Sequence, residues 1–190
     1  MANHYIWRIK ASKLDQKEVW VLDIETWGLN ARRFAFGILK NMKGDKEHIF
    51  YEPQKLRKFL ENQDNDIIVY AHNMWGFDGL AFFDKLEIKN AERIDAGSRI
   101  ISIKFPMSNP KLKMEWRDSA SLIPMRVSDI GDSLKMSKGI TPIDYIRGNK
   151  REITNEDIEY CRRDVDIIRV ALTELEILFN GWLNNKDHVS

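Results

Sequence analysis

VWVLDIET, at residues 19–26, is a short apolar run that ends in acidic residues. Its first part is rich in β-branched side chains, which is typical of a strand buried inside a sheet. Asp23 and Glu25 lie two positions apart, so in an extended strand their side chains point to the same face. A carboxylate beside apolar residues loses hydration, which costs free energy unless a cation or a donor compensates. A shared metal ion is one interpretation of this pair, and a solvated turn is the alternative.

Further strands and helices follow this run along the chain. Apolar, β-branched or alternating segments predict six strands, at residues 19–24, 33–40, 47–51, 67–71, 99–105 and 113–118. Helices are predicted from Pro53, over about 77–86, over 127–134, and from an N-cap at Thr154. The last helix has the clearest apolar stripe, which consists of Cys161, Val165, Ile168, Leu172, Leu175 and Phe179. Residues 139–150, with Pro142 and Gly148, read as a loop.

This order of elements predicts one α/β domain in which helices flank a mixed central sheet. Its core is expected over residues 19–180, with an N-terminal extension at 1–18 and a polar tail at 181–190. The chain has 190 residues and 43% hydrophobic residues, which excludes a highly charged disordered chain. With 30 basic and 29 acidic side chains it has no global basic field. Any nucleic-acid binding must therefore come from local patches or metal ions.

The single cysteine, Cys161, excludes an intramolecular disulfide and a zinc site built on several thiolates. It belongs to the apolar stripe and has no histidine placed as its partner, so we set it aside as a nucleophile. One buried cysteine fits a reducing compartment, and we expect the protein in the cytoplasm. No apolar run approaches the roughly 18 residues of a membrane span, so no membrane partner is expected.

A second acidic motif follows the predicted strand at 67–71. Asn73 and Asp78 lie in the sequence AHNMWGFDG at residues 71–79, where a buried strand gives way to a helix. Irregular backbone at the carboxyl end of a strand is where α/β folds place ligand groups. A plain turn with a helix cap explains the same residues equally well. His72 is a weak metal-ligand candidate, because a lone histidine beside a strand is more often a packed residue.

A third motif lies on the last helix. Tyr160 and Asp164 are four residues apart, so they stack on one face about a turn apart. An ordinary helical acid paired with Arg163 or Arg169 is the alternative interpretation. Together the three motifs supply four acids beside apolar runs, and four carboxylates gathered in one place would raise each other's pKa. Two divalent cations would balance their charge, and oxygen-only ligands favour Mg²⁺ or Mn²⁺ over zinc.

The order and spacing of these motifs resemble the three exonuclease motifs of the DEDD superfamily of 3′–5′ exonucleases, in its tyrosine-containing branch. The matching residues are Asp23-Ile24-Glu25-Thr26, then Asn73 with Phe77-Asp78, then Tyr160 with Asp164. The histidine branch carries its histidine one residue further from the last aspartate, where this chain has Glu159. This resemblance implies a ribonuclease H-like fold and hydrolysis by two divalent ions.

The chain also resembles the proofreading domain of protein-primed family B DNA polymerases, over about residues 19–178. Arg117-Asp118-Ser119 before Ile123-Pro124 is similar to that family's Ser-Leu motif, with Ala120 in place of leucine and Ser121-Leu122 as an alternative register. Lys138-Gly139, followed by Ile143-Asp144-Tyr145, is similar to its lysine segment, with two extra residues between. The chain has no Asp-Thr-Asp tripeptide like that of their palm domain. We therefore expect a free-standing exonuclease, and a piece cut from a longer polymerase is the alternative.

The resemblance implies a role for each matching residue. Asp23 would bridge both metal ions, Glu25 and Asp164 would bind the ion that activates water, and Asp78 would bind the second ion. Tyr160 would orient the attacking water and Lys138 would offset charge on the phosphate. The residues implied in substrate binding are Thr26, Asn73, Phe77, Ser119 and Tyr145.

The function expected from this resemblance is 3′–5′ hydrolysis of single-stranded DNA to nucleoside monophosphates, in viral replication or in proofreading in trans. A basic lip for the strand is expected from Lys138, Arg147, Lys150 and Arg151, with a solvated loop as the alternative. A DNA polymerase or another replication protein is the expected protein partner, in the cytoplasm of a bacterial or archaeal host. A 3′–5′ exoribonuclease and a non-catalytic module that binds DNA ends or docks on a polymerase are the alternative functions.

Overall fold

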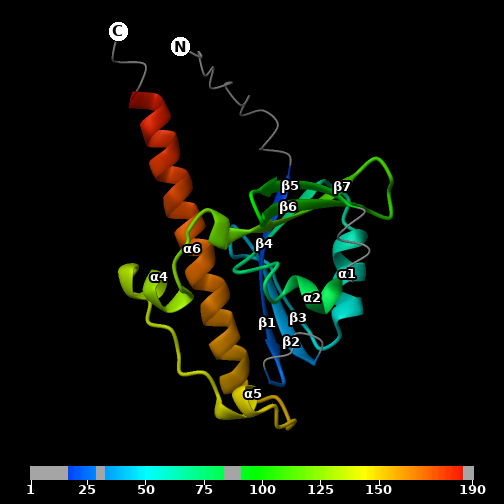
Figure 1. Ribbon diagram of the computed structural model, residues 1–190, viewed down its shortest axis with the longest axis vertical. Helices are drawn as coiled ribbons and strands as arrows, with labels where there is room; N and C mark the ends of the chain where they lie inside the picture. The colour runs from blue at the N-terminus through cyan, green and yellow to red at the C-terminus, as the bar shows by residue number, and fades with distance from the viewer. Residues whose placement is uncertain (1–16, 29–32, 84–90, 186–190) are drawn as a thin grey trace.

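A computed structural model of the protein describes residues 17–28, 33–83 and 91–185. Within these residues, seven strands form one mixed sheet in the order β3-β2-β1-β4-β7-β6-β5 (Figure 1). The strands are β1 (Glu18–Thr26), β2 (Phe34–Asn41), β3 (Glu47–Phe50), β4 (Ile67–Ala71), β5 (Glu92–Ala96), β6 (Arg99–Pro106) and β7 (Lys113–Asp118). β1, β2 and β3 form an antiparallel meander, whereas β4 pairs in parallel with β1 and β7 in parallel with β4. This arrangement is consistent with a ribonuclease H-like fold.

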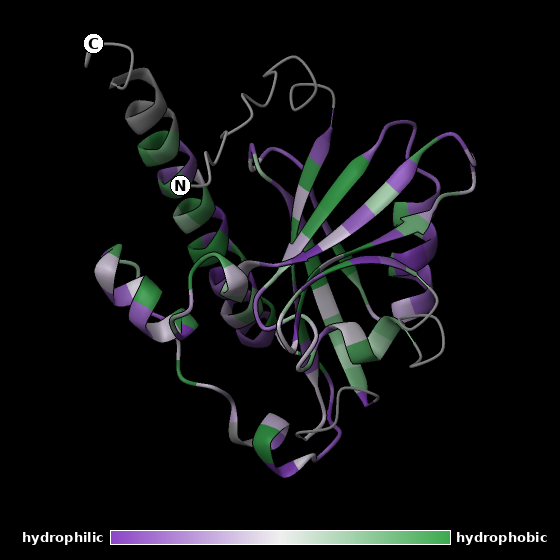
Figure 2. Cartoon of the chain, turned by 45° about the horizontal axis from the view of Figure 1, so that its top comes forward, coloured by the Kyte–Doolittle hydropathy of each residue, from purple (hydrophilic) through white to green (hydrophobic). Residues whose placement is uncertain are grey.

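β1 lies in the middle of the sheet and is covered on both faces. Trp20, Leu22 and Ile24 pack into the core beside α1 (Pro53–Glu61) and α2 (Gly79–Phe82), whereas Val21 packs into the core beside α6 (Asn155–Asn185). Figure 1 shows the helices on the two sides, and Figure 2 shows the hydrophobic colouring of the inner strands. Because side chains alternate along a strand, Asp23 and Glu25 share the α6 side with Val21.

α6 has 31 residues and runs antiparallel to β1. Near the start of α6, the Cys161 thiol contacts Asp23 at the end of β1. Two turns later, the Arg169 guanidinium donates to the Met42 carbonyl. The Met42 amide in turn donates to the Val19 carbonyl at the start of β1. The helix therefore extends past the beginning of the strand. The predicted apolar stripe is buried as far as Leu172, whereas its last two members, Leu175 and Phe179, are exposed.

The six predicted strands are all present, with small shifts at their ends. β5 was not predicted, because all five of its residues are exposed and it has no apolar face for a pattern to reveal. α2 is shorter than the helix predicted over 77–86, and residues 84–90 lie outside the described part of the chain. α4 (Val127–Ser133) is present as predicted. The predicted loop at 139–150 contains the short helix α5 (Ile143–Arg147), which ends at Gly148 with a positive φ of 75°.

The predicted terminal segments are only partly described. Residues 1–16 of the N-terminal extension and residues 186–190 of the polar tail lie outside the described residues. The first part of the predicted tail continues α6 to Asn185. Among the described helices, none combines the length and the apolar character needed to cross a membrane.

Thr154 and Asp157 form a reciprocal cap at the start of α6. The Asp157 carboxylate accepts from the Thr154 amide at 2.8 Å, and the Asp157 amide donates to the Thr154 hydroxyl at 3.4 Å. Arg151 makes a two-pronged pair with the same carboxylate, at 2.5 and 2.7 Å, and its Nε donates to Asp144 at 2.8 Å. Asp157 is 1% exposed. These contacts fasten α5 and the following loop to the start of α6.

We expect Asp157→Asn to lower the free energy of unfolding by about 2 kcal/mol, because it weakens several hydrogen bonds to a buried charged group. Urea denaturation followed by circular dichroism measures this. Burial acts to raise the pKa of Asp157, but the bonds from Arg151 and Thr154 outweigh it and the net pKa is lowered. The contribution is therefore present above the unfolded pKa of about 4 and is lost as the pH falls through the folded value.

Glu174→Gln is the matched control, because Glu174 is an exposed acid on the same helix. It should change stability by less than about 0.5 kcal/mol. Equal stability of Asp157→Asn and wild type at pH 7 would show that the cap contributes nothing.

Candidate active site

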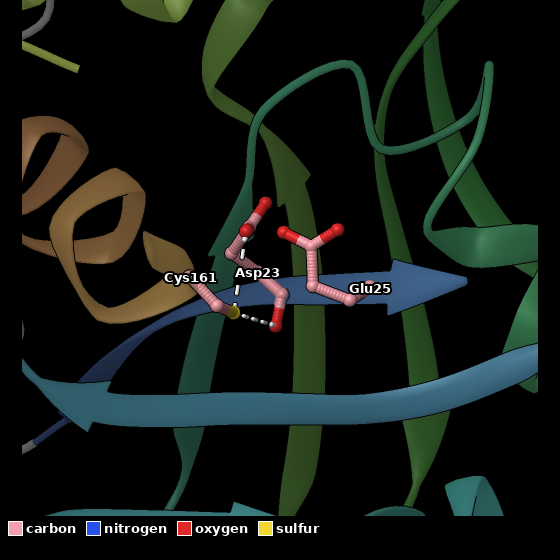
Figure 3. Close-up of side chains that lie close together, drawn as sticks. All are labelled: Asp23, Glu25 and Cys161. Carbon is pink, nitrogen blue, oxygen red and sulfur yellow. Dashed lines mark hydrogen bonds between the residues drawn. The ribbon is translucent and has the colours of Figure 1, made fainter. Parts of the chain in front are cut away.

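Side chains from separate parts of the chain meet between the end of β1 and the start of α6. Asp23 and Glu25 come from β1, Asp78 lies at the N-cap of α2, and Asp164 is on α6. Oxygen atoms of Asp23 and Glu25 and the Cys161 sulfur all lie within 4.8 Å of one another (Figure 3). Asp164 acts electrostatically on both Asp23 and Glu25, and Asp78 and Asp23 act on each other. The structure thus brings together the four acids predicted from the three motifs.

The turn after β4 delivers Asp78 to this site. Asn73 has a left-handed φ of 59°, and its carbonyl accepts from the amides of Gly76 and Phe77. A Cβ at Gly76 would lie 2.4 Å from the Asn73 side-chain oxygen, so a larger residue there would force the Asn73 side chain to move. The Gly79 amide then donates to the carbonyl of Met74, which is fully buried. This compact turn joins the end of β4 to α2 and buries Asp78 to 3% exposure.

Burial raises the pKa of all four acids, and repulsion from a neighbouring acid adds to it at Asp23, Glu25 and Asp78. Loss of hydration is the main cause at Asp23, followed by the charge of Asp164, and together they raise its pKa from 3.8 to about 7. Loss of hydration followed by the charge of Asp23 raises the pKa of Glu25 and of Asp78 well above their ordinary values. Burial also raises the pKa of Asp164. Such a cluster favours protonation or the binding of cations.

Lys138 supplies one positive charge to the cluster. Its ammonium lies 2.5 Å from one Asp164 oxygen and 5.3 Å from the centre of the Tyr160 ring. Burial acts to lower the pKa of Lys138, but the contact with Asp164 outweighs it and the net pKa is raised, so Lys138 is charged. The other Asp164 oxygen is buried and has no hydrogen-bond partner among the described residues. One ammonium leaves most of the acidic charge without compensation.

These donors suit a hard divalent cation. The four acids offer only oxygen atoms, as Mg²⁺ and Mn²⁺ prefer, and the unpartnered Asp164 oxygen is a free ligand position. Cys161 is fully buried, and burial followed by the charge of Asp23 raises the pKa of its thiol. The neutral thiol contacts an Asp23 carboxylate oxygen at 3.4 Å, as Figure 3 shows. This environment agrees with setting Cys161 aside as a nucleophile.

Tyr160 borders the cluster, one turn before Asp164 on α6. Its ring packs against Gly139, where a Cβ would lie 3.0 Å from a ring carbon. Its hydroxyl is 2.7 Å from the Thr141 hydroxyl. Sequence reasoning missed Thr141, because it lies in the two-residue insertion of the lysine segment and no motif marks it.

The remaining predicted residues differ in exposure. Asn73 is exposed and Phe77 half-buried on the turn before α2. Thr26 is buried, and its hydroxyl donates to the Gly28 carbonyl at 2.7 Å. Ser119 is fully buried, and its hydroxyl donates to the Ala71 carbonyl at 3.2 Å. Thr26 and Ser119 therefore support the backbone around the site, and their direct contact with substrate remains a prediction.

Tyr145 and its neighbours attach the segment after Lys138 to the end of β1. The Tyr145 ring is 3% exposed and stacks on Trp27, with ring centres 4.9 Å apart. The Tyr145 carbonyl accepts from the Gly28 amide at 2.6 Å, and the Gly148 carbonyl accepts from Arg33 at 2.9 Å. Tyr145 thus anchors this segment, and a direct contact between Tyr145 and substrate also remains a prediction.

His72 and the predicted basic lip also take part in contacts within the protein. His72 Nε2 donates to the Met125 carbonyl at 2.7 Å and Nδ1 lies 3.1 Å from the Ser119 hydroxyl, so His72 links β4 to the loop after β7. In the lip, Lys138 pairs with Asp164 and Arg151 with Asp144 and Asp157. Arg147 and Lys150 are exposed. The lip predicted from four basic residues is therefore reduced to these two.

Comparisons with known proteins agree on the fold. No protein-family model matches the chain, and no curated protein matches it by sequence. Among solved structures, phi29 DNA polymerase complexed with single-stranded DNA matches with a TM-score of 0.68 and 19% identity, over 88% of this chain and 32% of that chain. The same polymerase with primer-template DNA matches with a TM-score of 0.69 and 20% identity, over the same shares. An orthorhombic crystal form of phi29 DNA polymerase matches with a TM-score of 0.66 and 20% identity, over 82% of this chain and 30% of that chain.

This chain therefore spans about a third of the length of the polymerase chains that it matches. The likeness covers most of this chain, and it shows that the two proteins share a fold over that part. At 19–20% identity it says nothing further about individual side chains.

The cluster predicts a pH-dependent stability of the metal-free protein. The pKa of Asp23 is raised to about 7 in the folded protein. Its contribution to the free energy of unfolding is therefore fully present below the unfolded pKa and is lost as the pH rises through the folded pKa. In the presence of a chelator, the free energy of unfolding of the wild type should fall by on the order of 2 kcal/mol between pH 5 and pH 8, and that of Asp23→Asn should fall by less. Urea denaturation at the two pH values measures this.

Asp132→Asn, which removes an exposed acid on α4, is the control and should keep the wild-type slope. Identical slopes for wild type and Asp23→Asn would mean that Asp23 is not destabilised by its surroundings.

Proposed function

We propose that this chain is a metal-dependent 3′–5′ exonuclease that hydrolyses single-stranded DNA from its 3′ end and releases nucleoside monophosphates. The observation that carries the proposal is the meeting of four desolvated carboxyl groups with Tyr160 and Lys138. The order of these residues in the chain resembles the tyrosine-containing DEDD exonucleases. The shared fold with a polymerase solved in complex with single-stranded DNA also supports the proposal. The proposal includes a role in viral replication or proofreading, beside a DNA polymerase or another replication protein.

Asp23, Glu25, Asp78 and Asp164 would hold two divalent ions, Mg²⁺ or Mn²⁺. Such ions supply Lewis acidity, which makes water a better nucleophile and stabilises the oxygen that leaves phosphorus. The pKa values of the acids are raised first by burial and then by mutual repulsion, and bound cations would offset both by stabilising the charged carboxylates.

The reaction adds one water molecule across the last phosphodiester bond. The water oxygen forms a bond to phosphorus while the bond from phosphorus to the 3′ oxygen of the preceding nucleotide breaks. Tyr160 would hydrogen-bond the water and fix its direction of attack, and Lys138 would offset charge on a phosphate oxygen. The shortened strand keeps a 3′ hydroxyl and is ready for the next cycle.

The turn and loops around the acids would hold the end of the strand. Phe77 is half-buried and offers a surface on which a base or sugar can pack, and the Asn73 side chain is exposed beside it. Arg147 at the end of α5 and Lys150 after it are exposed, and they can attract the phosphate backbone. Thr26 and Ser119 would act from behind this surface.

We expect Asp164→Asn to lower the rate of oligonucleotide shortening by at least a factor on the order of a hundred, because it removes a charge required by the transition state. The assay follows a 5′-labelled single-stranded DNA oligonucleotide with Mg²⁺ or Mn²⁺, and a chelator should stop the reaction. Glu176→Gln is the matched control. Glu176 is an exposed acid on α6, outside the acidic cluster.

The product pattern distinguishes the candidate functions. A ladder that shortens by single nucleotides from the 3′ end supports the exonuclease. Faster shortening of a matched RNA oligonucleotide would favour the exoribonuclease, and binding of DNA ends without cleavage would favour the non-catalytic module. Equal activity of wild type and Asp164→Asn would refute the assignment of the acids.

Tyr160→Phe should lower kcat by about ten- to a hundredfold with little change in KM, because it removes the hydroxyl but keeps the ring. Steady-state kinetics on the same oligonucleotide measure the two constants separately. An unchanged kcat would remove Tyr160 from the mechanism.

A further inference from the structure

The contact between Thr141 and Tyr160 links the segment after Lys138 to the helix that carries Asp164. The two hydroxyl oxygens lie 2.7 Å apart, which is a normal distance for a hydrogen bond between hydroxyl groups. Thr141 is half-buried and Tyr160 is 9% exposed, so solvent does not readily replace this contact. A hydroxyl partner at this distance restricts the rotation of the tyrosine O–H bond.

The position of Thr141 is fixed on both sides. Before it, Gly139 packs on the ring of Tyr160, and Lys138 pairs with Asp164. After it, α5 begins, and Tyr145 in that helix stacks on Trp27 at the end of β1. The Thr141 hydroxyl therefore belongs to a segment that is anchored at two points.

The Tyr160 hydroxyl lies between Thr141 and two charged groups. Lys138 and Asp164 act on the pKa of Tyr160 in opposite directions, and the ammonium of Lys138 lies 5.3 Å from the centre of the ring. A tyrosine hydroxyl has a single hydrogen, so its hydrogen bond with Thr141 decides where that hydrogen points. If Thr141 donates, the Tyr160 hydrogen stays available to the water and phosphate, and if Tyr160 donates, its oxygen stays available to accept. Either arrangement fixes the orientation of the hydroxyl.

We propose that Thr141 is a positioning residue, whose hydrogen bond with Tyr160 fixes the orientation of the Tyr160 hydroxyl beside the acidic cluster. Its effect on catalysis rests on the proposed exonuclease function, whereas its effect on the Tyr160 hydroxyl does not. Thr141 acts through Tyr160 alone and does not touch the reacting atoms.

The kinetic test compares Thr141→Val, which keeps the shape of the side chain, with Thr141→Ser, which keeps the hydroxyl. Thr141→Val should lower kcat about fivefold with unchanged KM, as expected for the loss of one ordinary hydrogen bond, and Thr141→Ser should restore kcat to within about twofold. In the Tyr160→Phe background, Thr141→Val should have no further effect. Thr173→Val is the matched control and should behave as wild type. It removes another threonine hydroxyl on α6, which donates to the Arg169 carbonyl.

A spectroscopic test needs no activity. In protein labelled with ¹³C at the tyrosine Cζ atom, the signal missing from Tyr160→Phe identifies Tyr160. This signal should shift in metal-free Thr141→Val and return in Thr141→Ser. A wild-type protein without nuclease activity would refute the proposed function and leave this test valid. An unshifted Tyr160 signal, or equal effects of Thr141→Val on kcat in the wild-type and Tyr160→Phe backgrounds, would overturn the role of Thr141.

Discussion

Repulsion among carboxyl groups between β1, α2 and α6 must be offset before this fold is stable. Asp23 and Glu25 belong to a strand whose two faces are both covered, so water screens their charges only in part. The chain offsets part of the cost with Lys138, whose ammonium contacts Asp164, and with the thiol of Cys161, which contacts Asp23. Most of the acidic charge remains without a partner. The site therefore costs the fold stability, as the raised pKa values of its acids show.

Ion pairs on either side of Asp164 hold α6 against the sheet. Arg162 pairs with Glu47 of β3 at 2.7 Å, and Asp166 pairs with Lys40 of β2 at 2.9 Å. Both pairs lie two residues from Asp164, so they determine how the helix is rotated above β1. Val165 and Ile168 also hold α6 in this orientation, because they pack into the core between the helix and the sheet. The position of one buried acid therefore depends on contacts with two other strands.

The sequence predicted the elements that bury apolar side chains, because burial leaves a periodic pattern. β1 and the first half of α6 are such elements, and so the four acids were expected near one another. β5 is exposed throughout and leaves no pattern, so it was not predicted. Leu175 and Phe179 continue the pattern of α6 but are exposed, so the apolar pattern alone does not show where burial ends.

Motifs indicate where a residue lies in the fold, but not which of its atoms are accessible. Ser119 and Tyr145 stand at positions that the resemblance assigns to substrate, yet both side chains are buried against neighbouring elements. The pairing of Lys138 with Asp164 and the contact between Thr141 and Tyr160 depend on how a loop without periodicity crosses α6. No spacing in the sequence encodes that crossing.

The pairing of Lys138 with Asp164 has a consequence for how the site can be loaded. One Asp164 oxygen already has a cation as its partner, and only the other is vacant. A metal ion that bound this carboxylate would compete with the ammonium for the same negative charge, so loading here would be partly an exchange of counter-ions rather than a simple addition of charge. The ammonium stands on a flexible stem beside the acids, as a positive charge that the chain itself carries.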